Sequence, residues 1–421
     1  MTEQPATSVR GLPLGTAAMA ESPYAWLRLV VSLVITTIGG VGLWSIAVVM
    51  PTIEAEFGVA RADASLPFTL LMIGFAAGGI LMGRLMDRFG IAAPLGLGAV
   101  ALAAGYVLAG KSETLWQFAL AHGLLVGFLG SSATFGPVLA DISRWFTTHR
   151  GIAVAVAACG SYLAGTVWPP VIQYFVETAG WRATHVGIGL FCLVTIPPLT
   201  LVLRPRPPQT QSAANGLAGE SHASLNGLSP GILQTLLVIA GLTCCIAMAM
   251  PQVHIVSLCT DLGYGTARGA QMLSVMLATG IVSRLGFGFV ADRIGPIPTF
   301  LLSSALQALS LLLYLPFDSL PSLFMVSALF GLAQGGIVPT YAMIIRAYFP
   351  AAEAGTRIGL VISATLIGMA IGGWMSGAIF DLTLSYDLAF LNGFFWNLVN
   401  TSIALWLLFR LYRRTPLAVG A

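Results

Sequence analysis

Long apolar runs that carry no charge recur along the whole chain. Residues 92–110, for example, read AAPLGLGAVALAAGYVLAG, without one acidic or basic side chain. About twenty such residues in a helix cross the hydrocarbon core of a bilayer, with every backbone polar group bonded inside the helix. This pattern predicts twelve transmembrane helices, at residues 27–51, 64–86, 92–110, 115–140, 151–175, 184–203, 231–256, 269–291, 297–316, 321–345, 358–381 and 388–410.

The composition also indicates an all-α polytopic membrane protein. Of the 421 residues, 57% are hydrophobic and 8% are charged, whereas soluble domains have about 25% charged residues. A transmembrane barrel would instead show short segments of alternating hydrophobicity. The five cysteines have no ligand-like spacing and four lie in apolar runs, so we interpret them as packing residues and predict neither a metal site nor a cofactor.

The longest polar interruption divides the twelve spans six and six. Residues 204–230 are rich in Pro, Ser, Asn and Gly, which cannot build a packed core, and they are interpreted as a linker. The linker separates a predicted N-terminal six-helix bundle, residues 27–203, from a C-terminal one, residues 231–410. Polar tails are expected at 1–26 and 411–421, and the first of them lacks the continuous apolar core of a cleavable signal peptide.

Both predicted bundles carry the pattern G-x-x-x-D-R-x-G at the end of their second span. The two copies, GRLMDRFG and GFVADRIG, begin 205 positions apart, because 288 − 83 = 205. Their shared residues are Gly83, Asp87, Arg88 and Gly90 in the first copy, and Gly288, Asp292, Arg293 and Gly295 in the second. The repetition predicts two pseudo-symmetric halves.

The distribution of lysine and arginine predicts the orientation. With an even number of spans, both termini lie on one side, and 14 of the 19 basic residues belong to that side. Arg61, Lys111, Arg182 and Arg268 fall on the other side, and Arg284 falls within a span. The positive-inside rule then places both termini and the linker in the cytoplasm, with a bacterial inner membrane as the expected location.

Twelve spans, a six-plus-six division and the repeated loop motif resemble the major facilitator superfamily over nearly the whole chain. In that family the loop joins spans 2 and 3, and again spans 8 and 9. Its aspartate caps a neighbouring helix N-terminus and braces one conformation, which agrees with the helix dipole. The resemblance therefore assigns the eight repeated residues to a conformational brace.

Finer motifs resemble the monocarboxylate and oxalate–formate branch of this family. Residues 51–90 and SRWFTTHRGIAVAVAACGSYLAG, residues 143–165, look like its span 1–2 and span 5 regions. Its pattern S-R-x-x-x-G-x-x-x-D is matched by Ser283, Arg284, Gly288 and Asp292, and the branch uses this arginine to bind the substrate carboxylate. Gly280 stands where animal carriers often have a proton-linked aspartate, and the predicted span 11 lacks the lysine of the oxalate exchangers.

Physical reasoning reaches Arg284 independently. Arg284 lies eight residues before Asp292, or about 12 Å below the predicted helix end, and half the hydrocarbon core is about 15 Å. A mid-membrane arginine costs at least about 2.5–3.5 kcal/mol, and no predicted span has an acidic residue at this depth. We therefore expect its planar guanidinium to bind a carboxylate in a central cavity. The alternative is a structural arginine bonded to backbone carbonyls.

Several other residues have a similar predicted depth, where the two halves of a transporter meet. Aromatic, hydroxyl and amide side chains can shape and orient a small ligand, although packing between helices is the alternative role for each. These substrate-site candidates are Trp44, Thr134, Tyr162, Gln334, Tyr341 and Trp374. Because histidine titrates near neutrality, His254 and His122 are candidates for proton coupling or gating, with a simple interfacial hydrogen bond as the alternative.

The sequence thus predicts a monomeric secondary active transporter of a small organic monocarboxylate. Protons or a counter-transported anion, together with the lipid bilayer, are the other expected partners, and nucleic acid is not. Because the sequence shows no nucleotide loop, metal cluster or nucleophile–base pair, we do not expect an enzyme. The alternative is an exporter of a neutral metabolite or drug, in which Arg284 would be a gating residue.

Overall fold

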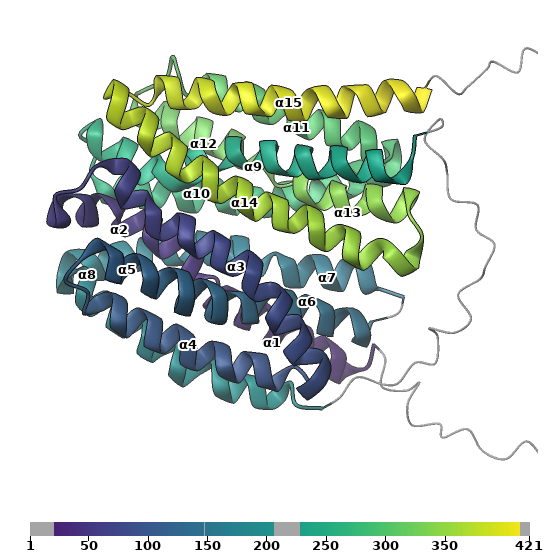
Figure 1. Cartoon of the computed structure of the whole chain (residues 1–421), viewed down its shortest axis with the longest axis horizontal. Helices are drawn as coiled ribbons and strands as arrows, with labels where there is room; N and C mark the ends of the chain where they lie inside the picture. The colour runs from purple at the N-terminus through teal and green to yellow at the C-terminus, as the bar shows by residue number, and fades with distance from the viewer. Residues whose placement is uncertain (1–20, 147, 206–227, 413–421) are drawn as a thin grey trace, which may run out of the picture.

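The structure, a computed structural model, describes residues 21–146, 148–205 and 228–412, which form helices joined by short turns (Figure 1). Most of the predicted N-terminal tail, linker and C-terminal tail lies outside the described residues. The first half contains α1 (Pro23–Gly39), α2 (Val41–Phe57), α3 (Arg61–Phe89), α4 (Ala92–Gly110), α5 (Leu115–Leu120), the π-helix η2 (Ala121–Ser131), α6 (Ser132–Trp145), α7 (Arg150–Ala158) and α8 (Gly160–Val202). The second contains α9 (Pro230–Asp261), α10 (Thr266–Ile294), α11 (Pro296–Leu313), α12 (Leu320–Gln334), α13 (Ile337–Tyr348), α14 (Ala351–Thr383) and α15 (Asp387–Tyr412).

The helices account for the twelve predicted spans. Eleven continuous helical stretches in the described part of the chain are long and apolar enough to cross a membrane. The longest, Arg150–Val202, has 53 residues, and Gly180 interrupts it with φ 81° and ψ 157°. Because glycine adopts positive φ without a steric penalty, the chain reverses there and makes two spans of this stretch. The prediction of twelve transmembrane helices is confirmed.

The repeated motif ends both of its helices in the same way. Gly90 and Gly295 have φ values of 81° and 87°. Their N–H groups donate to the carbonyls of Met86 and Ala291, at 2.8 and 2.9 Å. A residue with a side chain would be strained at either position, so the last glycine of the motif fixes the turn into the next span.

One span has a backbone that the apolar pattern did not predict. The eleven residues of η2 form a π-helix between α5 and α6, whereas most π-helical segments are single turns. Glycines bring η2 and α3 together, since a Cβ on Gly74 would collide with the carbonyl of Gly123, and one on Gly127 with the backbone of Leu71.

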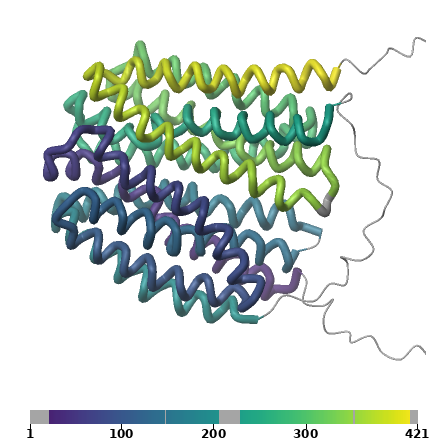
Figure 2. The backbone as a smooth tube through the Cα atoms, viewed as in Figure 1, coloured from purple at the N-terminus to yellow at the C-terminus, as the bar shows by residue number. Residues whose placement is uncertain are grey.

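The two halves lie side by side, with α3 and α14 crossing between them (Figures 1 and 2). The start of α1, the end of α8, the start of α9 and the end of α15 all lie at one end of the bundle (Figure 1), which we call the linker end. The other end, where α2 turns into α3 and α14 turns into α15, is the opposite end.

Candidate functional site

A cavity of about 140 Å³ lies between the two halves. Its walls come from α2, α3 and α8 of the first half and from α9, α10, α13 and α14 of the second. Most of the lining is apolar, and Arg284 is its charged side chain; no aspartate or glutamate lines it. The cavity therefore holds a cation without a neutralising carboxylate.

The guanidinium of Arg284 is held from one side. Its Nη1 donates to the carbonyl oxygen of Ala158 at 3.1 Å, and its Cζ lies 4.3 Å from the ring centroid of Tyr162. The Nε is buried and has no acceptor among the described residues. A buried charged donor without a partner costs about 1–3 kcal/mol or more, so an anion in the cavity would remove an existing penalty.

A break between two helices supplies the carbonyl that binds Arg284. Because α7 ends at Ala158 and α8 begins at Gly160, the carbonyl of Ala158 lies at the C-terminus of α7. A cation is favourable at such a C-terminus. The carbonyl of Ser161 accepts a hydrogen bond from Nε1 of Trp44 at 3.0 Å, so the same break positions two of the predicted site residues.

Gly280 leaves room for the ring beneath Arg284. A Cβ on Gly280 would lie only 2.7 Å from Cδ1 of Tyr162 and still closer to Cε1. The aromatic ring therefore fills the space that an aspartate at position 280 would need. Tyr162 and an acidic residue at this position exclude one another in this conformation.

Small residues bring α10 against α12 at the depth of Arg284. A side chain on Gly335 would collide with the carbonyl of Gly280, and Ser283 donates from Oγ to the carbonyl of Leu332 at 2.6 Å. Close backbone contact of this kind fixes the rotation of a helix about its axis. Ser283 thus faces α12, while Arg284, one residue on, lines the cavity.

Gln334 lies one hydrogen bond behind the cavity wall. Its Oε1 accepts from Nε2 of Gln252 at 2.7 Å, and Gln252 itself lines the cavity. The sequence analysis missed Gln252, although a polar residue directly after Pro251 in an apolar span was a usable signal.

Besides Gln334, three predicted site residues do not line the cavity. The hydroxyl of Tyr341 donates to Oδ1 of Asn400 at 3.1 Å, within the second half. Oγ1 of Thr134 donates to the carbonyl of Ser131 at 3.0 Å, within the first half. Trp374 is 44% exposed, because it follows the cavity residue Met369 by five positions, which rotates it by about 140° around α14. The similar predicted depth of these residues in the membrane therefore did not mean that their side chains point toward the cavity.

His254 belongs to the opposite end rather than to the cavity wall. It is fully buried, with Nε2 at 2.8 Å from the carbonyl of Gly373 and Nδ1 at 3.1 Å from the hydroxyl of Tyr386. Because a carbonyl can only accept, Nε2 carries the hydrogen and Nδ1 can accept from the tyrosine. These contacts are compatible with a neutral imidazole.

Arg61 joins the two halves at the opposite end, and the sequence analysis treated it only as a loop charge. It is 6% exposed. Its guanidinium bonds to Glu54 of its own half at 2.9 Å and to the Asp261 carboxylate of the other half. Nη1 also donates to the hydroxyl of Tyr386 at 3.0 Å, and Cζ lies 4.0 Å from the ring of Phe380.

Asp381 makes a second connection between the halves. Its two carboxylate oxygens accept from the backbone N–H groups of Arg61 and Ala62, at 2.9 and 2.8 Å. These are the first residues of α3, where unpaired N–H groups and the helix dipole favour an anion. A carboxylate of the second half thus caps a helix of the first.

The linker end has no comparable connection in the part of the chain that the structure describes. Asp87 pairs there with Arg144 of its own half at 2.7 Å, and both side chains are exposed. Asp292, Arg88 and Arg293 are exposed as well. The helix cap predicted for the two aspartates is not formed here. With the halves closed at the opposite end, a brace at the linker end stays a prediction for another conformation.

His122 lies away from the cavity, in an aromatic cluster of the first half. Its Nδ1 lies 2.9 Å from the carbonyl of Phe118. Its ring centroid is 5.8 Å from that of Tyr106 and 5.6 Å from that of His185. No described contact connects it to Arg284, so the structure favours packing for this residue.

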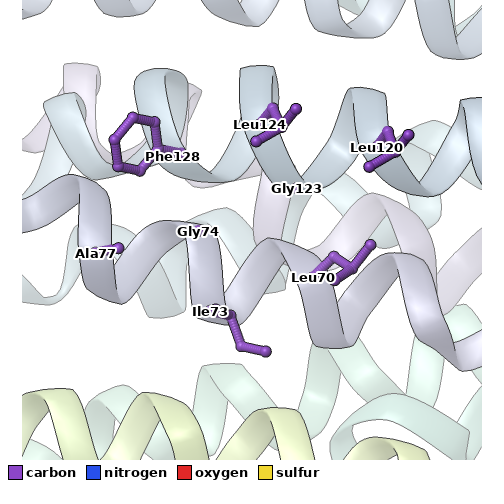
Figure 3. A pocket seen from close by; sticks show the side chains of 8 residues that line it. All are labelled: Leu70, Ile73, Gly74, Ala77, Leu120, Gly123, Leu124 and Phe128. Atoms are coloured by element: carbon purple, nitrogen blue, oxygen red, sulfur yellow. The ribbon is translucent and has the colours of Figure 1, made fainter.

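A second hollow of about 240 Å³ runs along the outer face between α3 and η2 (Figure 3). Its lining is entirely apolar, and Ile73 and Leu124 beside it are exposed. Its lining offers no polar side chain that could bind a polar ligand.

The comparisons with known proteins agree with this geometry. The sequence profile of the Major Facilitator Superfamily matches residues 32–315 and 237–420. The chain belongs to the Major Facilitator Superfamily. It is therefore a multi-pass membrane protein of a transporter family. A bacterial homologue of the human lysosomal transporter Spinster, solved in an inward-facing and occupied conformation, has the same fold, with a TM-score of 0.68 and 13% identity over 93% of this chain and 96% of that one.

Curated members of the superfamily resemble the chain at low identity. The MFS-type transporter pynF of Aspergillus niger is 26% identical over 316 residues, or 75% of this chain and 70% of its own. Monocarboxylate transporter 13 of Bos taurus is 28% identical over 313 residues, or 73% of this chain and 71% of its own. The resemblance to the monocarboxylate branch that the motifs predicted is confirmed.

Proposed function

We propose that the protein is a secondary active transporter of a small organic monocarboxylate. The observation that carries this proposal is Arg284, a permanent cation in a cavity between the halves whose lining contains no carboxylate. One hydrogen bond and one ring hold the guanidinium, and its buried Nε lacks an acceptor. A substrate carboxylate would supply that acceptor, and the planar fork suits bidentate binding.

The size and lining of the cavity favour a small substrate with one negative charge. A cavity of about 150 Å³ holds a molecule the size of benzene, and this one measures about 140 Å³. Among the described residues that line it, Arg284 is the one cation. A second carboxylate would therefore lie against apolar side chains without a compensating charge, at a cost of several kcal/mol. Dicarboxylates and large drug-like molecules should therefore be poor substrates.

The contacts between the halves support alternating access. In this conformation Arg61 and Asp381 hold the opposite end closed, and we infer that the cavity opens toward the linker end. The excess of basic residues at the linker end supports a cytoplasmic location of this end in a bacterial inner membrane. Under this proposal the conformation corresponds to an inward-facing state.

Proton symport and anion exchange are the two proposed forms of coupling. His254 contacts Tyr386, which bonds in turn to Arg61. A proton bound at His254 would disturb this connection between the halves, which favours symport through this residue. Anion exchange needs no proton-binding site. It is favoured if the rate of uptake does not depend on a pH gradient.

Uptake by proteoliposomes tests the proposal. We expect uptake of at least one of lactate, pyruvate, formate and aromatic acids, little uptake of oxalate, and loss of uptake in Arg284→Gln. Arg284→Lys keeps the charge without the fork, and its KM should rise about tenfold or more. Arg268→Gln, which changes an exposed arginine on the same helix, is the matched control. Unchanged monocarboxylate uptake in Arg284→Gln would instead favour the exporter of neutral molecules.

A further inference from the structure

Two amide side chains bring unused hydrogen-bonding groups to the cavity. Gln252 is 3% exposed, lines the cavity and donates from Nε2 to Oε1 of Gln334 at 2.7 Å. Its own Oε1 makes no hydrogen bond within residues 21–146, 148–205 and 228–412. The Nε2 of the fully buried Gln334 also has no acceptor there.

The other polar groups around Gln252 are already bonded. The hydroxyl groups of Ser161 and Thr365 donate to the carbonyls of Ala158 and Ile362, at 3.1 and 2.7 Å. The indole of Trp44 is likewise bonded to a carbonyl. Apart from Arg284 and the hydroxyl of Tyr162, which lies beside it, Gln252 brings to the lining a polar atom without a partner among the described residues, whereas the hydroxyls of Ser161 and Thr365 have only acceptor lone pairs left.

The amide pair can serve a ligand in two ways. In one arrangement Gln252 presents its oxygen to the cavity. If both amides rotate by half a turn, Gln334 becomes the donor of the same single hydrogen bond and Gln252 presents its NH₂ group. Each arrangement leaves a buried polar group unpaired, at a cost of about 1–3 kcal/mol, which a hydrogen-bonding ligand would reduce.

We propose that Gln252, positioned by Gln334, binds a second and uncharged polar group of the substrate. The substrates are then monocarboxylates that carry a hydroxyl, carbonyl or amide group, and simple alkyl carboxylates are second best. This inference rests on the proposed function, because it assumes that Arg284 holds the carboxylate. A site built to bond a hydroxyl group discriminates strongly against the analogue that lacks it.

The test uses four acids with one carbon skeleton: butyrate and its 2-, 3- and 4-hydroxy derivatives. Their kcat/KM values for uptake are measured in proteoliposomes of the wild type, Gln252→Met and Gln334→Met. Gln307→Met is the matched control, because this buried amide bonds to Cys244 away from the cavity.

We expect one hydroxy isomer to exceed butyrate by about tenfold or more in the wild type, the size of one good hydrogen bond. Gln252→Met should bring this ratio near one, whatever its effect on the absolute value for butyrate. Gln334→Met should lower the ratio partly, and Gln307→Met should leave it unchanged.

The inference is overturned if no hydroxy isomer exceeds butyrate in the wild type, or if the preference survives in Gln252→Met. The wild-type comparison and Gln334→Met decide the question even if Gln252→Met does not fold. Failure of the proposed function looks different, because butyrate uptake would then survive in Arg284→Gln.

Discussion

Nη1 of Arg61 donates a hydrogen bond to the hydroxyl of Tyr386 at 3.0 Å, across 325 positions of sequence and from one half of the protein to the other. The same guanidinium bonds to the carboxylates of Glu54 and Asp261. One largely buried side chain therefore connects the end of α2, the end of α9 and the turn before α15. This cluster at the opposite end must come apart before the cavity can open there.

Arg61→Gln should shift the protein toward conformations open at the opposite end. Loss of the charged bonds to the second half removes about 1–3 kcal/mol from the closed state, or about five- to 150-fold in the equilibrium. Cys245, which lines the cavity, is a natural reporter in a variant whose other four cysteines are replaced by alanine. Its modification by an impermeant maleimide added on the opposite side should accelerate.

Arg144→Gln is the matched control, because it breaks an ion pair inside one half, at the linker end. Its labelling rate from the opposite side should equal that of the wild type. Equal rates for Arg61→Gln and the wild type would show that this arginine does not hold the end closed.

Gly280→Ala should weaken substrate binding although it adds a single methyl group. The new Cβ collides with the ring of Tyr162, which must move away from Arg284 and lose a cation–π contact of about 0.5–2 kcal/mol. We expect KM for the best monocarboxylate to rise about three- to thirtyfold, with little change in thermal stability. Tyr162→Phe should keep the contact, and Tyr162→Leu should reproduce the loss.

Gly286→Ala provides the comparison on the same helix, because a Cβ there meets nothing within 4 Å. It should leave KM unchanged and stabilise the helix slightly. A KM of Gly280→Ala equal to that of Gly286→Ala would mean that the ring position does not matter for binding.

The sequence predicted the spans well because hydropathy and glycine turns are local properties. Even the interruption between spans 5 and 6 was placed near Gly180, where the backbone reverses. The direction of a side chain around its helix is not local, because it depends on which neighbour the helix packs against. Trp374 and Thr134 have suitable depth but face away from the cavity, whereas Gln252 faces it. The position of Arg284 in the cavity was predictable because a charged side chain inside a membrane span almost always faces the interior of the bundle or a water-filled cavity.

Asp141→Asn should destabilise the first half strongly. Arg28 is fully buried and donates to both carboxylate oxygens of Asp141, from Nε at 2.7 Å and from Nη2 at 2.9 Å. Removing one partner of a buried ion pair leaves a buried charge uncompensated, at about 3–5 kcal/mol. Thermal unfolding in detergent should show a clearly lower midpoint. Asp87→Asn removes an exposed ion pair and should lower the free energy of unfolding by about 1 kcal/mol or less. Equal shifts of the unfolding midpoint in the two variants would refute the role of the buried ion pair.

His254→Gln should abolish accumulation driven by a pH gradient while it preserves exchange of labelled for unlabelled substrate without a gradient. The reason is its contact with Tyr386: a neutral His254 can accept at Nδ1 from the tyrosine hydroxyl, which in turn accepts from Arg61. A protonated His254 would donate at Nδ1, so Tyr386 would have to turn its hydrogen toward another acceptor and the closed end would loosen. Glutamine can form hydrogen bonds but cannot take up a proton near neutral pH.

His122→Gln, in the aromatic cluster away from the cavity, should leave both assays unchanged. Gradient-driven accumulation that persists in His254→Gln would remove this histidine from the coupling mechanism, and anion exchange would become the preferred form of transport.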